Sequence, residues 1–520
     1  MDVGRSVTEL YKIWLAGGAV LLALAWGVIP RKWALQGLVA LTALAVMNYA
    51  RWGFEAATSR LDAYDLLHYY VNAKYIDELG YLDLYPAVLL VDHEHQGPFF
   101  REQGSVYLAQ DERGHHLEPI GHALARGRVV RDERFTDERW AAFEHDVLYL
   151  QRVIGCRDRS SKGRCVRELD ENLWRQLIND HGFNGTTAWT LLAEPITQVV
   201  PVESLKVIGY LDVVLLGGAL ALVVWAYGAV PALWLTLFLT VTYSTRWPYF
   251  SWVFLRYDWV AALVAATALL KLGRPFPAGL LAGWATLSRF FPAMYLWGPF
   301  CKGVALLARG VVSKPLLTFA GAVVLAVVLV QGAATARYGA ATVRSHFENM
   351  MDHNEPEQLS SRRIGLALAL ATEPWEGTAA ERVITAERKE RIERQSPARY
   401  LIGLAAMLGL GWVLRARRDD EAFAYGFLPF FLLTTASYYY YVARAPLIVV
   451  HAAGMDRWRD RVGLAYLLAL EVFCNAAETY APGHRLFLIG DLAWGLAGYT
   501  ALMIGWMAWD ARAARTEEAT

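Results

Sequence analysis

The chain has 520 residues, of which 55% are hydrophobic and 13% aromatic, and its 50 basic residues are balanced by 50 acidic ones. Because there is no net positive charge, nothing in the composition points to nucleic acid. The hydrophobic residues form blocks of roughly 15–25 residues with few charges, which excludes an ordinary soluble globular protein and predicts an all-α polytopic membrane protein.

Two apolar blocks, at 13–29 and 33–50, open the chain and predict an N-terminal transmembrane hairpin over residues 1–50. No small-residue cleavage site follows the first block, so we expect no cleavable signal peptide. A long polar segment follows at 51–207. It contains amphipathic helical patterns, which predict a folded extracytoplasmic subdomain rather than a linker.

The stretch 64–79 of this polar segment predicts a helix that lies along the membrane face. Asp65 and Tyr69 share one side of such a helix, and Lys74 can pair with Glu78 on another. On periodicity alone, the tyrosines simply anchor an interfacial helix and Asp65 interacts with the helix dipole. The functional alternative is that Asp65, held where bilayer meets water, accepts a proton from a hydroxyl whose reaction partner is carried by a lipid.

This stretch resembles the first extracytoplasmic loop of the GT-C superfamily, integral-membrane glycosyltransferases that use polyprenyl-phosphate sugars as donors. The likeness is to the bacterial, mannosyltransferase-like branch. The matching residues are Asp65, Tyr69, Tyr70, Ala73, Gly80 and Tyr85. The resemblance implies an inverting transfer of a sugar to an acceptor hydroxyl, with Asp65 as the general base and Asp62 as a second candidate. The polar segment here is longer than in the simplest members, and one more span precedes it.

Apolar blocks then continue through a transmembrane bundle at 208–336. After a second polar segment at 337–398, they resume in C-terminal helices with a short tail at 399–520. These blocks are 208–227, 230–245, 258–272, 276–290, 293–308, 315–336, 399–414, 422–440, 442–455, 462–480 and 486–508. Proline at 292 is expected to break the stretch 276–308 into two short spans. With the resemblance, the pattern predicts a GT-C-type bundle of about 11–13 transmembrane helices with extracytoplasmic helical loops.

Short loops rich in Lys and Arg set the expected orientation, because the positive-inside rule places such loops in the cytoplasm. They lie at 31–32, 271–274, 309–314, 415–418, 457–461 and 512–515. Both polar segments then fall on the same extracytoplasmic side, where we expect the active site, and the C-terminus is cytoplasmic. The N-terminus is extracytoplasmic in this topology unless the first span is re-entrant. The expected location is the bacterial inner (plasma) membrane.

Three further groups of charged residues fall on the side expected for Asp65. Arg256 and Asp258 stand at the mouth of a span, where they either form an interfacial ion pair or present an arginine to a donor phosphate. Arg289 lies in an apolar run, where an ionisable residue is costly and often functional. The second polar segment adds a basic cluster, which either clamps a leaving phosphate or belongs to a solvated loop. This cluster includes His346, His353, Arg362 and Arg363.

The sequence therefore predicts Asp65 and Asp62 as catalytic candidates, together with a set of residues that bind the substrate or its lipid phosphate. That set is Tyr69, Tyr70, Lys74, Arg256, Asp258, Arg289, His346, His353, Arg362 and Arg363. The expected partners are a polyprenyl-phosphate sugar donor, a lipid or glycan acceptor and membrane lipids, with no nucleic acid and no cofactor. Two other functions remain open. One is a secondary transporter with Arg289 and Glu471 on its substrate path, although no internal repeat supports it. The other is a non-catalytic assembly or scaffold protein.

Two further patterns in the long polar segment have a chemical interpretation. Its paired histidines, at 93 and 95 and at 115 and 116, complete no recognisable set of metal ligands, so no metal is expected. Cys156 and Cys165 are close enough in sequence to form a disulfide in an oxidising compartment, or they remain free thiols.

Overall fold

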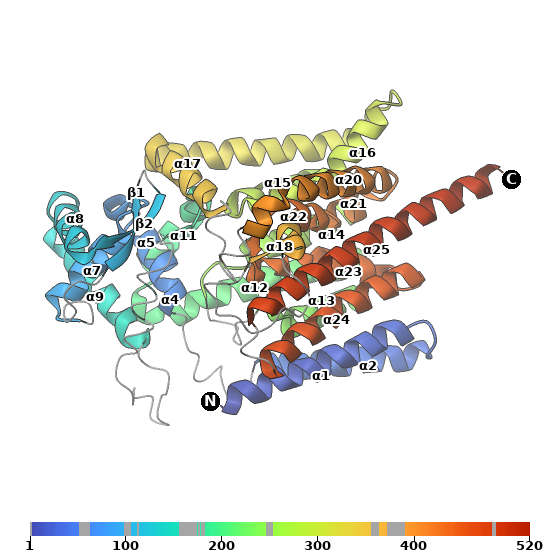
Figure 1. Ribbon diagram of the computed structural model, residues 1–520, viewed down its shortest axis with the longest axis horizontal. Coiled ribbons are helices and arrows are strands. Elements are labelled where there is room, and N and C mark those ends of the chain that lie inside the picture. Colours follow the sequence, from blue (N-terminus) through green and yellow to red (C-terminus); the bar gives the residue numbers. More distant parts are fainter. Residues whose placement is uncertain are drawn as a thin grey trace.

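The computed structural model of the chain is largely helical, with an elongated helix bundle and a smaller subdomain that covers one end of it (Figure 1). The C-terminal end of the last helix lies at the opposite end of the molecule from the subdomain. The structure describes residues 3–50, 52, 63–97, 106–111, 114–154, 174, 177, 183–245, 253–354, 363–371, 390–480 and 485–519.

The subdomain is built from short helices and one β-hairpin. Its elements are α4 (Ala63–Leu66), the π-helical turn η2 (Leu67–Val71), α5 (Asn72–Lys74), α6 (Ile76–Leu79), α7 (Leu84–Glu94), β1 (Val106–Asp111), β2 (Gly114–Pro119), α8 (Ile120–Arg134), α9 (Asp137–Ile154) and α11 (Thr187–Val199). They enclose a hydrophobic core of their own, which also includes Phe254 and Leu255 from a loop of the bundle. The described part of the first polar segment therefore packs around a core of its own.

The bundle opens with α1 (Val3–Ala25) and α2 (Arg31–Tyr49), which pack against each other. Its middle part comprises η3 (Val202–Ser204), α12 (Leu205–Tyr227), α13 (Ala229–Val241), η4 (Tyr243–Thr245), α14 (Asp258–Lys271), α15 (Pro275–Ser288), η5 (Phe291–Leu296), α16 (Trp297–Leu307) and α17 (Lys314–Asn354). Its last part comprises β3 (Arg363–Ile364), α18 (Leu366–Ala371), α20 (Ser396–Leu414), α21 (Asp419–Ala424), α22 (Phe427–Leu433), β4 (Ala436–Ser437), η7 (Tyr438–Arg444), α23 (Ala445–Ala453), α24 (Trp458–Tyr480) and α25 (Arg485–Ala519).

Within the described residues, the all-helical prediction holds except for two small antiparallel sheets. In the first, β1 pairs with β2 in the subdomain, with Val106 opposite Pro119 and Asp111 opposite Gly114. In the second, β3 pairs with β4, with Arg363 opposite Ser437. This second pairing joins residues far apart in the sequence and fixes Arg363 beside the start of η7.

Five of the described helices are long and apolar enough to cross a membrane, which makes the chain a membrane protein. They contain the segments Thr8–Ala25, Val202–Tyr227, Lys314–Met351, Ser396–Leu414 and Trp458–Tyr480. The apolar stretches expected as spans at 258–272 and 276–290 form helices of only 14 residues each. The stretch 422–440 is not one helix but several short elements. Pro429 within α22 lacks an N–H, and Gly426 permits a close approach to Tyr295 that a side chain would block.

The boundary expected at residue 337 lies inside a helix, because α17 continues to Asn354. Gly339 kinks this helix with a φ of 82°, in the left-handed region that glycine adopts easily. Just before the kink, Arg337 bonds Asp77 and Glu194 of the subdomain. These contacts attach the polar end of the helix to the subdomain. The break expected near Pro292 is confirmed, since α15 ends at Ser288 and a 3₁₀ helix follows.

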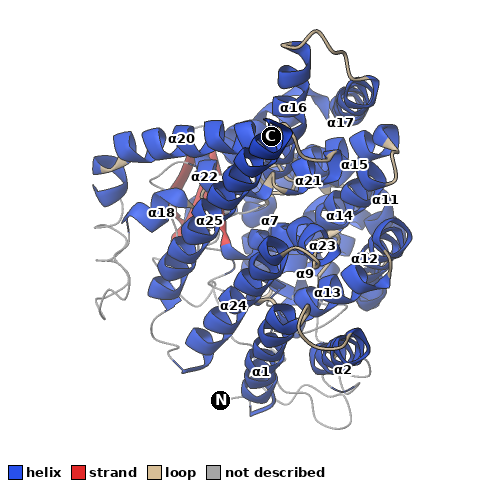
Figure 2. Ribbon diagram, turned by 90° about the vertical axis from the view of Figure 1, so that its right-hand side faces the viewer, coloured by secondary structure: helices blue, strands red, loops and turns tan. Residues whose placement is uncertain are grey.

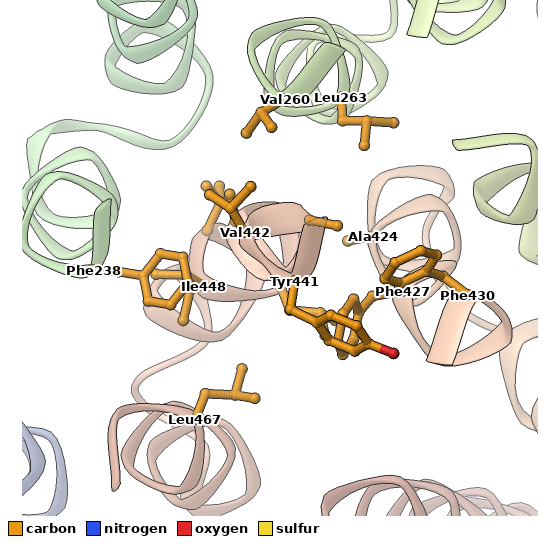
Figure 3. Close-up of a cluster of buried hydrophobic side chains, with 14 of the residues drawn as sticks. Phe238, Val260, Leu263, Ala424, Phe427, Phe430, Tyr441, Val442, Ile448 and Leu467 are labelled. Carbon is orange, nitrogen blue, oxygen red and sulfur yellow. The ribbon is translucent and has the colours of Figure 1, made fainter. Parts of the chain in front are cut away.

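The main hydrophobic core is centred on α14 and α23, which other helices surround in the end-on view of Figure 2. Every residue of α14 from Asp258 to Leu270 is buried. Figure 3 shows how side chains from α13, α14, α22, α23 and α24 and from η7 meet in this core. A helix hydrophobic on all sides is expected only where protein or lipid surrounds it, and here protein does. This core supports the loops that join the bundle to the subdomain.

Helices α15 and α17 approach each other through small residues, in the Gly-x-x-x-Gly pattern of Gly279 and Gly283. A Cβ at Gly279 would overlap the carbonyl oxygen of Phe319, which is backbone and cannot move aside. We therefore expect Gly279→Ala to destabilise the protein by about 1–3 kcal/mol, the cost of overpacking a tight interface. The thermal unfolding midpoint in detergent checks this. Gly217→Ala in α12 is the matched control, because no atom lies within 4 Å of a Cβ there. Equal midpoints for the two variants would contradict the role of close packing.

Candidate functional site

The stretch 64–79 is mostly buried inside the subdomain and is divided into several helical elements, so the prediction of a single helix is wrong. It consists of α4, η2, α5 and α6, with a turn at Tyr75. Tyr69 is 6% exposed and Tyr70 is fully buried. The reason is that the tyrosine hydroxyls find partners within the protein: Tyr70 donates to the carbonyl of Val200 at 2.7 Å. The π-helical turn is notable because such turns are frequent at functional sites.

Asp65 forms an ion pair with Arg256, which lies in the loop before α14. The two side chains are 14% and 9% exposed, so the pair is largely withdrawn from water. Burial alone would lower the pKa of Arg256, but the carboxylate of Asp65 and the neighbouring tyrosines together outweigh burial and raise that pKa well above its usual value. Because opposite charges stabilise each other's ionised form, the pair keeps the Arg256 guanidinium charged.

The ring of Tyr69 connects this ion pair to a second arginine. The guanidinium carbons of Arg256 and Arg289 lie 5.7 and 5.8 Å from its ring centroid, within the range of cation–π attraction. Its hydroxyl donates to Oδ1 of Asn184 at 2.5 Å. Burial raises the pKa of Tyr69, so the phenol remains protonated and acts as a donor.

Behind this ring is a cavity of about 100 Å³ between the subdomain and the bundle. We call it the cationic cavity, and its lining contains two arginines and a histidine but no carboxylate among the described residues. The lining residues are Tyr81, Asn184, Thr186, Arg289, Phe290, Phe291, His346, Asn349, Met350, Arg363, Thr435, Ala436, Ser437, Tyr439 and Tyr440. Asp65 and Arg256 do not line it. They lie one side chain away, because Arg256 stacks on the ring of Tyr439 with 4.6 Å between guanidinium carbon and centroid.

Two of the lining side chains have nitrogen atoms without a hydrogen-bond partner. Arg289 is 6% exposed and donates through Nη1 to the carbonyl of Ser288 at 2.8 Å, while its Nε has no partner. His346 is 5% exposed and its Nδ1 is likewise unpartnered. A buried polar atom without a partner is costly, so such atoms at one cavity indicate a place that a ligand completes.

The second arginine of the lining, Arg363, is held at the cavity by the pairing of β3 with β4. No carboxylate of the described residues pairs with it, and burial lowers the pKa of its guanidinium. Because an unpaired buried charge is unfavourable, the protein gains stability when an anion enters beside Arg363. The cavity is therefore suited to a small anionic group.

The remaining candidates lie elsewhere or outside the described residues. Asp258 accepts bonds from Trp284 at 3.0 Å and Ser288 at 2.6 Å, so it joins α14 to α15 rather than lining the cavity. Lys74 pairs with Asp146 at 2.7 Å, not with Glu78, and contacts the hydroxyl of Tyr70. Tyr70 and Lys74 lie four residues apart and share a side of the chain that points away from Tyr69. Asp62, Arg362 and the side chain of His353 are outside the described part of the chain.

Sequence reasoning missed several residues of this site. Tyr439 and Tyr440 belong to a run of four tyrosines at the end of an apolar block, which was a visible signal for a polar lining. Asn184 lies in the segment before α11, and only the fold shows that it accepts from Tyr69. Asn349 donates to Tyr81 and to the carbonyl of Phe183 at 3.3 Å each, contacts between segments remote in sequence.

Comparison with protein-family models, curated proteins and solved structures found no match. Fold and site together define a largely helical membrane protein whose subdomain and bundle enclose a cationic cavity, with an Asp–Arg ion pair one side chain away.

Proposed function

We propose that the chain is a membrane glycosyltransferase that transfers a sugar from a polyprenyl-phosphate donor to an acceptor hydroxyl, with inversion. The observation that supports this most is the cationic cavity. Arg289 and the segment that holds His346 and Arg363 are distant in the sequence, and they meet at one cavity, which lies one side chain away from Asp65. A carboxylate beside a carboxylate-free, cationic cavity suits a reaction that needs one base and a stabilised anionic leaving group.

The proposed step exchanges one bond at the anomeric carbon for another and moves one proton. The acceptor hydroxyl attacks the anomeric carbon while its proton passes to Asp65, and the bond from that carbon to the phosphate oxygen breaks. The bonding electrons leave with the polyprenyl phosphate, which gains one negative charge. Arg289, Arg363 and His346 lie where this charge develops, and interactions that strengthen as charge develops are those that raise the rate. A single displacement inverts the anomeric carbon.

The finer architecture is part of the same proposal. We place the chain in the GT-C superfamily, with a bundle of about 11–13 transmembrane helices in which short helices such as α14 and α15 also lie within the membrane. The cationic cavity then faces the extracytoplasmic side of a bacterial inner membrane. Phe290, at 46% exposure, stands at the cavity lining and suits the hydrocarbon side of a lipid-linked donor.

The transporter alternative required Glu471 and Arg289 on one path. Glu471 instead pairs with Arg444 at 2.6 Å, and both side chains are fully or almost fully buried. The direct test uses purified protein in lipid nanodiscs with a radiolabelled polyprenyl-phosphate sugar and a mixture of acceptor lipids and glycans. Transfer of label to an acceptor supports the enzyme. Uptake of the sugar into proteoliposomes without transfer would instead support the transporter. If neither transfer nor uptake is observed, the scaffold alternative is supported.

Replacing Arg363 separates a binding role from a structural one. We expect Arg363→Gln to weaken binding of polyprenyl phosphate by about 10- to 100-fold, since hydrogen bonds to charged groups contribute about 1.5–3 kcal/mol. The unfolding midpoint without ligand should stay equal or rise, because an unpaired buried cation is removed. Binding is measured by the ligand-induced shift of the unfolding midpoint. Arg344→Gln is the control, because that side chain is 81% exposed and pairs with Glu348. A drop in ligand-free stability without loss of binding would contradict this role.

A further inference from the structure

The loop that carries Arg256 is held by a carboxylate on a different helix. Asp212 lies in α12, in an otherwise apolar part of a membrane-spanning segment, and is 3% exposed. Its Oδ2 accepts the backbone N–H of Arg256 at 2.9 Å, and its Oδ1 accepts that of Tyr257 at 2.8 Å. Placing an ionisable side chain inside a membrane span costs free energy, and such residues usually have a function.

Two indole groups complete the support of the same turn. Trp189 donates to the carbonyl of Leu255 at 3.0 Å, and Trp259 donates to the carbonyl of Arg256 at 3.0 Å. Four consecutive backbone groups of the turn are thus bonded by side chains from α11, α12 and α14. Leu255 itself has a φ of 46°, in the left-handed region that residues with a side chain rarely adopt. Backbone strain of this kind persists only where the surroundings enforce it, and it is commonest at functional sites.

We propose that Asp212 is a positioning residue that sets the place of Arg256 and, through it, of the Asp65 carboxylate. The two N–H bonds orient the backbone of Arg256 so that its guanidinium reaches Asp65 and the rings of Tyr69 and Tyr439. The carboxylate also lies at the N-terminus of α14, where its negative charge is favourable. The catalytic consequence rests on the proposed function, whereas the structural one does not.

The inference predicts separate effects on rate and on binding. Asp212→Asn keeps the size of the side chain but offers one acceptor oxygen where two N–H groups need acceptors. We expect kcat for sugar transfer to fall by about 10²-fold, the usual effect of misplacing a reacting group by about 1 Å. KM for the donor should change little, since Arg289, His346 and Arg363 line the cavity and take no part in the four bonds that hold this turn. Trp259→Phe removes a single bond of the turn and should act in the same direction, with a smaller loss.

The experiment that tests the inference is a set of double-mutant cycles read by thermal unfolding. Asp65→Asn and Arg256→Gln are made singly and together in three proteins: the wild type, the Asp212→Asn variant and the Trp259→Phe variant. The coupling free energy between Asp65 and Arg256 should be largely lost in the Asp212→Asn variant and reduced in the Trp259→Phe variant. Asp420→Asn is the control: Asp420 is also buried, but it accepts from Tyr227 at the far end of α12, so this change should lower the midpoint and leave the coupling intact.

Each outcome decides the matter. Loss of coupling with a fall in kcat at constant KM supports the positioning role. Undiminished coupling in both backgrounds overturns it, and so does a lost coupling with full kcat. If wild-type protein transfers no sugar at all, the proposed function fails, and the coupling measurement alone still supports or overturns the placement of Arg256 by Asp212.

Discussion

Asp65→Asn is expected to reduce kcat for sugar transfer by about 10³-fold or more. A loss of this size matches the rate increase that a positioned general base usually contributes. The amide cannot accept the proton of the acceptor hydroxyl, but its oxygen can still accept a bond from Arg256. We therefore expect the variant to fold and to bind polyprenyl phosphate with unchanged affinity. Initial rates of label transfer from a radiolabelled donor, together with the ligand-induced shift in unfolding midpoint, measure both quantities.

Asp77→Asn serves as the control for this experiment, because Asp77 is 61% exposed and bonds Arg337, and neither residue lines the cationic cavity. Full transfer by Asp65→Asn would exclude Asp65 as the base and make Asp62 the next residue to test. A third pattern would show that the ion pair matters only for folding. In that case Asp65→Asn and Arg256→Gln would each reduce activity, while the double variant would regain it.

The largest effect on stability is expected at the buried pair of Arg444 and Glu471. Glu471→Ala should destabilise the protein by about 3–5 kcal/mol, the usual result of leaving one buried charge without its partner. The pair is 2.6 Å apart with exposures of 1% and 0%, and Glu471 also accepts the backbone N–H of Tyr243 at 2.7 Å. The loss is measured as a lower midpoint in denaturant or on heating.

A double replacement, Glu471→Leu with Arg444→Met, should recover part of that loss, because apolar residues of similar size often replace a buried ion pair without penalty. The N–H of Tyr243 then lacks its acceptor, which prevents full recovery. Glu348→Gln provides the comparison, since its pair with Arg344 is exposed and such pairs contribute about 0–1 kcal/mol. A Glu471 variant as stable as Glu348→Gln would contradict the importance of the buried pair.

Long apolar helices were predicted well from the sequence. The expected spans 208–227 and 399–414 match α12 and α20 within three residues at each end. The reason is that a long apolar stretch satisfies its backbone polar groups within itself only as a helix. The prediction of a single span at 422–440 was wrong, because hydrophobicity alone does not show where proline and tight packing interrupt a buried helix.

The candidate site was predicted in part. Unusual charges in apolar surroundings, such as Arg256 and Arg289, pointed correctly to residues that lie close to Asp65 in the fold. Which carboxylate faces which cation depends on contacts between remote segments, and a single sequence carries no information on these. The pairing of Asp65 with Arg256, and the separation of Lys74 from the site, therefore emerged only from the structure.

The cationic cavity takes its lining from the subdomain, from the break after α15, from the arm of α17 beyond its kink, and from β3 and η7. Ribosomal synthesis delivers these pieces in order, and Tyr440 is among the last. After Arg289 is synthesised, about 150 more residues must be added before Tyr440, a neighbour of Arg289 in the cavity lining, is present. Maturation of the site is consequently a late event in biogenesis, because a chain that ends before η7 lacks Tyr439 and Tyr440 and with them part of the cavity lining.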